Sequence, residues 1–198
     1  MIIKRVFDLF CSVVGLIVLL PILVCIALGV KMDSPGPVLF RQIRVGRFGK
    51  PFRIYKFRTM IVDAESVAGK ITGENDFRIT RFGIILRKYK LDELPQLINV
   101  LNGDMSLVGP RPEVPVYVSM FEKDYREILA VKPGITDYAA IEFRHEENLL
   151  GKSTDVEKVY TTEVLPKKIV LYKKYLQKRG FMTDIKIILL TLLKIVKK

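Results

Sequence analysis

The longest apolar stretch of the chain lies near its start and carries no charge. It runs over 22 residues, from Leu9 to Val30. As one helix it would be about 33 Å long, which is enough to cross a bilayer. Pro21 lies near its middle and removes a backbone hydrogen bond, so we expect the helix to break there. The pattern predicts a membrane-directed segment over residues 1–32.

Residues 33–165 alternate between strand-like and helix-like patterns and predict a small domain of mixed, helix-rich α/β class. Val38–Val45 and Pro51–Phe57, joined by a glycine turn, are typical of a β-hairpin. The other expected elements are a short polar helix over 63–69, a helix over 81–90 capped by Thr80, a helix over 92–102 capped by Asp92, a strand over 105–108, a helix over 115–130 and extended chain over 135–143.

The last part of the chain, residues 166–198, predicts two further helices. Pro166–Arg179 places six basic residues between apolar ones at helical spacing, which indicates an amphipathic helix on a membrane surface. The alternative is an ordinary surface helix that packs on the core. Phe181–Val196 is apolar almost all round, so we expect a second membrane-directed element there, with Lys186 and Lys194 as its polar positions.

Composition narrows the class of protein. The net charge is +12, which suits an anionic partner such as phosphate, nucleic acid or anionic lipid. With 49% apolar residues the chain is not intrinsically disordered. Two cysteines exclude a disulfide scaffold and a four-cysteine zinc site, and Cys11 and Cys25 are expected as apolar filler. The single histidine disfavours a histidine metal site, so any metal should be hard and oxygen-ligated.

The charges that flank the apolar stretch indicate its topology. Lys4 and Arg5 precede it, while Lys31 and a block with seven basic residues over 41–60 follow it. The positive-inside rule places both flanks in the cytoplasm, which favours a re-entrant helix over a single span. A cleaved signal peptide is disfavoured because no small-x-small site follows, and a lipoprotein signal because Val24 precedes Cys25.

Asp92 and Glu93 are the candidate chemical groups. Adjacent acids at a helix start can simply cap the helix and suit its dipole. Here, however, basic residues crowd around them in the sequence. Arginines that neutralise phosphate, next to a carboxylate that acts as nucleophile or holds Mg²⁺, suit phosphoryl transfer. The basic residues could also form a face on anionic lipid. The predicted phosphate ligands are Lys56, Arg58, Arg78, Arg81, Lys88 and Arg111.

Two long motifs resemble the bacterial sugar transferases, the small monotopic polyprenyl-phosphate phosphoglycosyl transferases. They are Lys56-Phe-Arg-Thr-Met60 and the run from Leu91 to Pro112, which holds the Asp-Glu pair and ends in Gly109-Pro-Arg-Pro112. Shorter matches at 33–37, 40–42 and 132–136 extend the resemblance over essentially the whole chain.

The resemblance implies an activity. Members move a phospho-sugar from a UDP-sugar to a polyprenyl phosphate, commonly undecaprenyl phosphate, and release UMP. They use a covalent intermediate on an aspartate, here Asp92, with Glu93 as its partner and Mg²⁺ held by this pair. The arginine of the proline-locked loop, here Arg111 between Gly109, Pro110 and Pro112, binds phosphate. Such enzymes lie on the cytoplasmic face of the bacterial inner membrane, on anionic lipids, with a re-entrant helix broken at a proline that Pro21 matches.

Two departures from the family pattern limit what the resemblance implies. Leu20, rather than a serine, precedes Pro21, so no side chain assists the break. Residues 137–147 also differ from the usual sequence, in a region expected near the sugar or nucleotide. The sugar, the glycan pathway and the oligomeric state, a homodimer included, are therefore left open.

Two other classes of protein share some of these sequence features. A membrane-tethered nucleic-acid binder would use the basic hairpin and its aromatic residues. No nucleic-acid motif is present, however, and the Asp-Glu pair would be idle, so no nucleic-acid partner is expected. A non-catalytic scaffold for polysaccharide enzymes would be expected to lack the Asp-Glu pair or the arginine loop, and both are intact.

Overall fold

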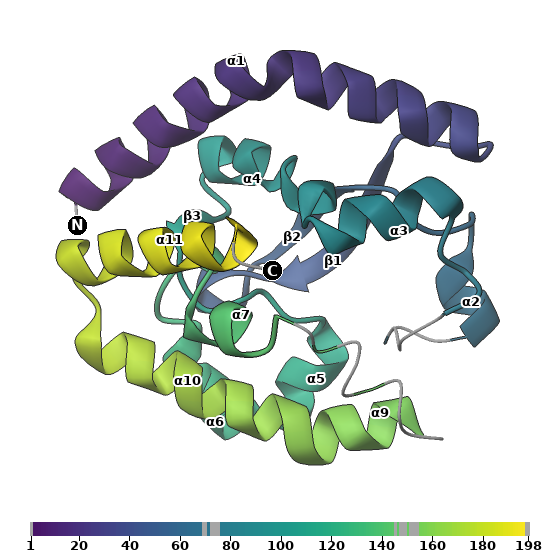
Figure 1. Cartoon of the computed structure of the whole chain (residues 1–198). Coiled ribbons are helices and arrows are strands. Elements are labelled where there is room, and N and C mark those ends of the chain that lie inside the picture. Colours follow the sequence, from purple (N-terminus) through teal and green to yellow (C-terminus); the bar gives the residue numbers. More distant parts are fainter. Residues whose placement is uncertain are drawn as a thin grey trace.

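The computed structural model describes residues 2–68, 71, 76–144, 146, 150 and 155–196. Helices surround two small sheets in a mixed, helix-rich α/β arrangement (Figure 1). The helices are α1 (Ile2–Asp33), α2 (Ala64–Ala68), α3 (Arg81–Lys88), α4 (Gln96–Asn102), α5 (Pro115–Met120), α6 (Glu122–Ile128), α7 (Tyr138–Glu142), α9 (Val156–Val159), α10 (Leu165–Lys178) and α11 (Phe181–Val196). The strands are β1 (Leu39–Val45), β2 (Pro51–Phe57), β3 (Ser106–Val108) and β4 (Gly134–Thr136).

Helix α1 is long and apolar enough to cross a membrane, by its length and composition. It continues through Pro21 without interruption, and Figure 1 shows it as an arch over the rest of the molecule. The structure therefore shows a bend where we expected a break. Most of its apolar side chains are exposed, among them Phe10, Ile17 and Leu28.

The first turns of α1 are bound to the domain by three charged residues. Nζ of Lys4 pairs with Asp184 at 2.6 Å and donates to the carbonyl of Val108 at 3.0 Å. Arg5 donates to two carbonyls at the end of α4, at 2.7 and 3.1 Å. Asp8 is buried and accepts from the Ser106 hydroxyl at 2.7 Å. Breaking such buried contacts would leave charges without partners, so this end of α1 is firmly anchored.

The other end of α1 contacts the same domain. The Asp33 carboxylate accepts a hydrogen bond from the backbone N–H of Phe82, at the start of α3. Ile26 and Val30 are buried in an apolar cluster with Phe57 and Leu86. Both ends of the arch are thus held by one folded body, which a straight membrane-crossing helix could not achieve.

The predicted hairpin is confirmed as the antiparallel pair β1–β2, with Leu39 opposite Phe57 and Val45 opposite Pro51. The capping of α3 is confirmed as well, because the Thr80 hydroxyl accepts from the Gly83 N–H. Helix α4 ends at Gly103 in the left-handed conformation, at φ 89°, as Asn102-Gly103 predicts.

Several boundaries differ from the expectation. Asp92 does not cap α4; it lies in a separate 3-10 turn, Leu91–Glu93. The expected helix over 115–130 is divided into α5 and α6 at Phe121, which leaves the helical region at ψ 39°. The extended chain expected over 135–143 is wrong beyond Thr136, because Asp137 caps the short helix α7.

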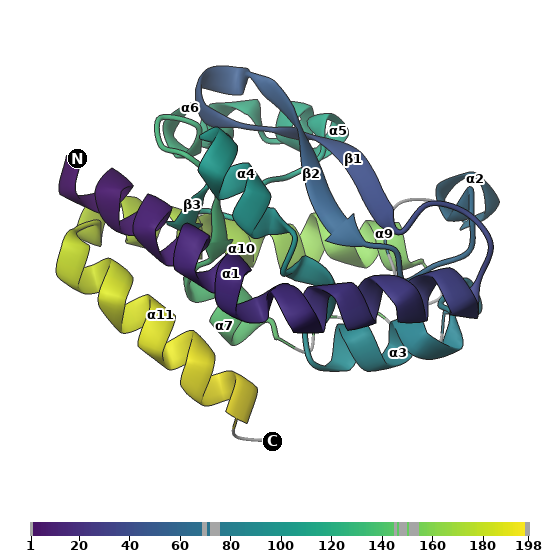
Figure 2. The same ribbon diagram turned by 90° about the horizontal axis from the view of Figure 1, so that it is seen from above.

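The two C-terminal helices behave differently. Buried side chains of α10, including Ile169 and Tyr172, belong to the largest apolar cluster, and the helix lies on the side of the molecule away from α1 (Figure 1). These contacts agree with the second interpretation of this segment, in which it is a surface helix that packs on the core. In contrast, α11 lies beside α1 in both views and exposes Leu189, Leu192 and Leu193 (Figures 1 and 2).

The anchored ends of α1 predict that the N-terminus lies on the same side of the membrane as the catalytic domain. In a variant in which Cys11 and Cys25 are replaced by alanine, a cysteine at Ile3, which is 72% exposed, should resist a membrane-impermeant maleimide in intact cells. It should react once the cells are permeabilised. A cysteine at Arg53 in the domain serves as the matched control. Labelling at position 3 alone in intact cells would show that α1 spans the membrane.

Candidate active site

Glu93 lies at the centre of the site. One of its oxygens, Oε1, pairs with Nζ of Lys56 at 2.9 Å and also with the Arg111 guanidinium, whose second nitrogen lies 3.0 Å from Oε2. Lys56 comes from β2 and Arg111 from the loop after β3, so this carboxylate joins three parts of the chain. The Arg111 and Lys56 charges hold the pKa of Glu93 well below its usual range, against the effect of burial. Glu93 is therefore ionised at neutral pH.

Asp92 lies in a different environment from its neighbour. It is 7% exposed, and its Oδ1 atom has no hydrogen-bond partner. Burial, together with the charge of Glu93, raises the pKa of Asp92, while Lys56, Lys90 and Arg87 oppose the rise. A carboxylate at a helix start would have a lowered pKa. At Asp92 burial outweighs any such effect, and the residue lies in the 3-10 turn before α4. A more basic carboxylate with an unpaired oxygen is suited to nucleophilic attack.

The loop that carries Arg111 is held by its backbone. Gly109 passes so close to the turn before β4 that a Cβ atom there would lie 2.5 Å from the carbonyl oxygen of Lys132. Gly134 donates to the Pro110 carbonyl at 3.0 Å, next to the parallel pair β3–β4. The Arg111 N–H in turn donates to buried Asp137 at 2.9 Å. These contacts hold the backbone at Gly109, Pro110 and Arg111 in place. The positioning role expected of Gly109, Pro110 and Pro112 stays a prediction.

Two cavities meet at Asp92. The smaller, about 380 Å³, reaches from Asp92, Glu93 and Arg111 to Tyr172, and residues 139–141, 143, 144 and 146 also line it. Those last residues belong to the segment that departs from the family pattern; residues 145 and 147 lie outside the described part of the chain. The larger cavity, about 1340 Å³, runs along β1 and residues 58–64. Both share Arg44, Lys56, Arg87 and Asp92.

The predicted phosphate ligands divide into three groups. Lys56 and Arg111 lie at the Asp-Glu pair. Arg58 and Arg78 line only the larger cavity and are buried; Arg58 donates to the carbonyls of Ser34 and Pro35, and Arg78 binds Asp76 at 2.6 Å and backbone carbonyls. These contacts hold loops together.

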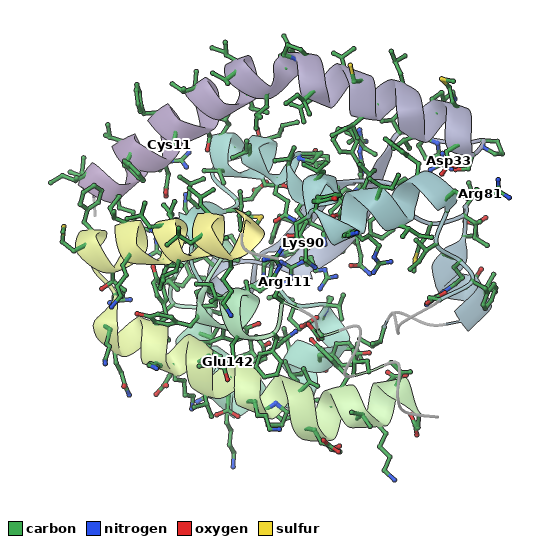
Figure 3. The ribbon with its side chains drawn as sticks, in the orientation of Figure 1. Cys11, Asp33, Arg81, Lys90, Arg111 and Glu142 are labelled. Atoms are coloured by element: carbon green, nitrogen blue, oxygen red, sulfur yellow. The ribbon has the colours of Figure 1, made fainter. Side chains whose placement is uncertain are left out.

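Arg81 and Lys88 are the third group and lie away from the pair. Both are exposed and line neither cavity. Figure 3 shows Arg81 near Asp33 at the edge of the molecule, whereas Lys90 and Arg111 lie together at its centre. Arg87 and Lys90, which belong to the same basic run, line the smaller cavity instead. The sequence does not show that Arg87 and Lys90 face the cavity while Arg81 and Lys88 do not, because the direction of each side chain depends on where α3 ends.

The side chains of the site offer few ligands for the expected Mg²⁺. Among the described residues no group of three or more His, Cys, Asp or Glu could hold a metal. Mg²⁺ nevertheless often takes only one or two carboxylates and completes its shell with substrate phosphates and water. The unpaired Oδ1 of Asp92, with Glu93 beside it, could supply the one or two carboxylate ligands that Mg²⁺ needs.

Comparison with known proteins agrees with the geometry. The model of the family described as "Bacterial sugar transferase" matches residues 1–198. The chain belongs to this family. It is 40% identical, over 96% of its length, to the UDP-glucose:undecaprenyl-phosphate glucose-1-phosphate transferase of Escherichia coli, of which it covers 39%.

Two further relatives carry related names. A protein of the same name from Caulobacter vibrioides is 39% identical over 95% of this chain and 67% of its own length. The UDP-N-acetylgalactosamine-undecaprenyl-phosphate N-acetylgalactosaminephosphotransferase of Aeromonas hydrophila is 43% identical over 70% of this chain and 34% of its own. This sugar transferase chain thus spans little more than a third of the length of several curated relatives.

The close approach at Gly109 predicts that Gly109→Ala disturbs the arginine loop. The added Cβ must push against backbone, so the free energy of unfolding should fall by about 1–3 kcal/mol, seen as a lower midpoint in thermal denaturation. Gly180→Ala is the control, because a Cβ at Gly180 meets nothing within 4 Å. Equal midpoints for the two variants would show that the loop has room.

The charge of Lys56 predicts a pH effect. Its ammonium group lowers the pKa of Asp92, so Lys56→Met should raise that pKa. The acid limb of the pH–rate profile should then move to higher pH, because Asp92 would act as a nucleophile only in its ionised form. Arg53→Met, on the same strand but lining neither cavity, is the control. An acid limb that stays in place or moves to lower pH in Lys56→Met would contradict the prediction.

Proposed function

We propose that this sugar transferase moves a phospho-sugar from a UDP-sugar to a polyprenyl phosphate, most simply undecaprenyl phosphate, and releases UMP. The observation that carries the proposal is the buried carboxylate of Asp92, with one unpaired oxygen, beside the cations Lys56, Arg87 and Lys90 at a cavity. The names of the relatives supply the substrate classes. The reaction would be the first membrane step in the synthesis of a surface glycan or glycoconjugate.

The reaction divides into two displacements. An oxygen of Asp92 attacks the phosphorus that bears the sugar, and the bond from that phosphorus to the bridging oxygen breaks, so that UMP leaves with the electron pair. An oxygen of the acceptor phosphate then attacks the same phosphorus. The bond to Asp92 breaks, which returns the free carboxylate and gives the polyprenyl-diphosphate sugar.

The remaining side chains supply charge and position. Arg111 and Lys56, held by Glu93, place two cations next to Asp92, where the phosphate oxygens of the donor would lie. A bound Mg²⁺, held by Asp92 and Glu93, would neutralise further phosphate charge. Burial of Asp92 excludes water from the carboxylate and so protects the intermediate from hydrolysis.

The surface supports a monotopic location on the cytoplasmic face of the inner membrane. The arch of α1, Ile84 and Ile85 on α3, and the outer side of α11 all expose apolar residues. In Figure 2, α3 and α11 lie beside the arch of α1. Basic residues beside them suit anionic lipids. A re-entrant α1 would keep both of its anchored ends in the cytoplasm.

The test is release of UMP from a panel that includes UDP-glucose and UDP-N-acetylgalactosamine, with membranes that contain the protein and undecaprenyl phosphate. Asp92→Asn should lower the rate at least about a thousandfold, because the nucleophile is lost. Its thermal midpoint should stay close to that of the wild type, since the amide has nearly the same shape as the carboxyl group it replaces. Full turnover in Asp92→Asn, or no UMP from any donor, would contradict the proposal.

A further inference from the structure

Helix α11 has two sides with different surroundings. Leu189, Leu192 and Leu193 are exposed on one side. On the other, Asp184 and Ile187 are buried, and the Thr191 hydroxyl lies 2.7 Å from that of Thr136 on β4. This inner side continues into the last turn, where Thr191 and Lys194 line the smaller cavity together with Asp92. A lysine of the apolar helix is thereby part of the wall of the active site.

Lys90 lies just after the end of α3 and, like Lys194 of α11, lines the smaller cavity. The helix exposes Ile84, Ile85 and Tyr89, and Lys90 follows in the left-handed conformation at φ 57°. Lys90 also lines the smaller cavity, and its charge acts on both Asp92 and Glu93. Figure 2 shows α3 and α11 beside the arch of α1. Lys90 thus lies two residues beyond the end of α3, and Lys194 lies in the last turn of α11. Both lysines line one cavity, next to helices that expose apolar side chains.

The other charges of this cavity are largely paired. Glu93 is bound by Lys56 and Arg111, Glu113 by Arg44 at 3.0 Å, and Glu146 by Lys168 at 2.6 Å. Lys90 and Lys194 form no salt bridge within the described part of the chain. Arg144, another described residue at this cavity, forms no salt bridge with the described residues either. The cavity therefore offers Lys90, Lys194 and Arg144 to an incoming anion, next to apolar surface.

We propose that Lys194, together with Lys90 at the same cavity, binds the phosphate of the isoprenoid acceptor at the membrane surface, while Lys56 and Arg111 serve the donor. The assignment rests on the proposed function. A lipid phosphate lies at the headgroup plane, and its chain must stay in an apolar medium. The ends of two helices whose apolar sides face that medium satisfy both demands. The same cations could bind the phosphate of a bulk anionic lipid, so the test separates the two sources.

The experiment uses the full chain in nanodiscs that contain undecaprenyl phosphate. Lys194→Gln should raise the KM for undecaprenyl phosphate about tenfold, as expected for the loss of one charged contact. The UMP released from the UDP-sugar without acceptor should not change, because the donor step does not use Lys194. Lys194→Arg should recover most of the lost affinity. Lys186→Gln is the matched control, since Lys186 is exposed on the same helix and lines neither cavity.

The outcomes separate the possibilities. If Lys194→Gln and Lys186→Gln give the same KM and weaken binding to anionic vesicles equally, Lys194 binds bulk lipid and the assignment is overturned. Loss of UMP release without acceptor in Lys194→Gln would also overturn it, because the residue would then serve the donor. If the wild type is active and the KM for undecaprenyl phosphate rises in Lys194→Gln but not in Lys186→Gln, the assignment holds. No UMP from the wild type with any donor would refute the proposed function itself.

Discussion

The carboxylate of Glu93 is the point at which separate parts of the site meet. It binds Lys56 of the hairpin and Arg111 of the loop after β3, and it lies in the turn before α4. Removing one partner would leave buried charge uncompensated, which is costly, so the three parts hold each other in place. Burial, with the charge of ionised Glu93 as a smaller contribution, raises the pKa of its neighbour Asp92, which also has an unpaired oxygen. Two adjacent acids thereby acquire different roles from their surroundings.

The same site is tied to the apolar helix. Arg5 binds the end of α4, and Lys4 and Asp8 bind β3, the strand that leads into the arginine loop. A change in the position of α1 would therefore reach both the Asp-Glu turn and Arg111. This arrangement would suit the proposed transfer to a lipid acceptor, because the apolar surface of α1 and the groups of the site belong to one network of contacts.

Much of the fold could be predicted from local signals, such as the hairpin, the Thr80 cap and the Asn102-Gly103 helix end. The failures have physical causes. Asp92 was expected as a helix cap, but the turn at Lys90 and Leu91 separates it from α4. Arg58 and Arg78 were expected at phosphate, yet carbonyl groups bind both, and a sequence does not show which backbone oxygens a guanidinium will meet. Long motifs in the sequence single out Asp92, Glu93 and Arg111, which line one cavity in the structure, whereas the place of Lys194 at that cavity depends on how α11 packs.

Asp92 rather than Glu93 is the proposed nucleophile, because, of these two carboxylates, only Asp92 has an oxygen without a hydrogen-bond partner. Peptide mapping by mass spectrometry, after the wild-type protein is incubated with UDP-sugar in the absence of a lipid acceptor, tests this assignment directly. A phospho-sugar should be found on Asp92, formed as UMP is released. A phospho-sugar on Glu93 or on any other residue, or release of UMP without an adduct, would contradict it.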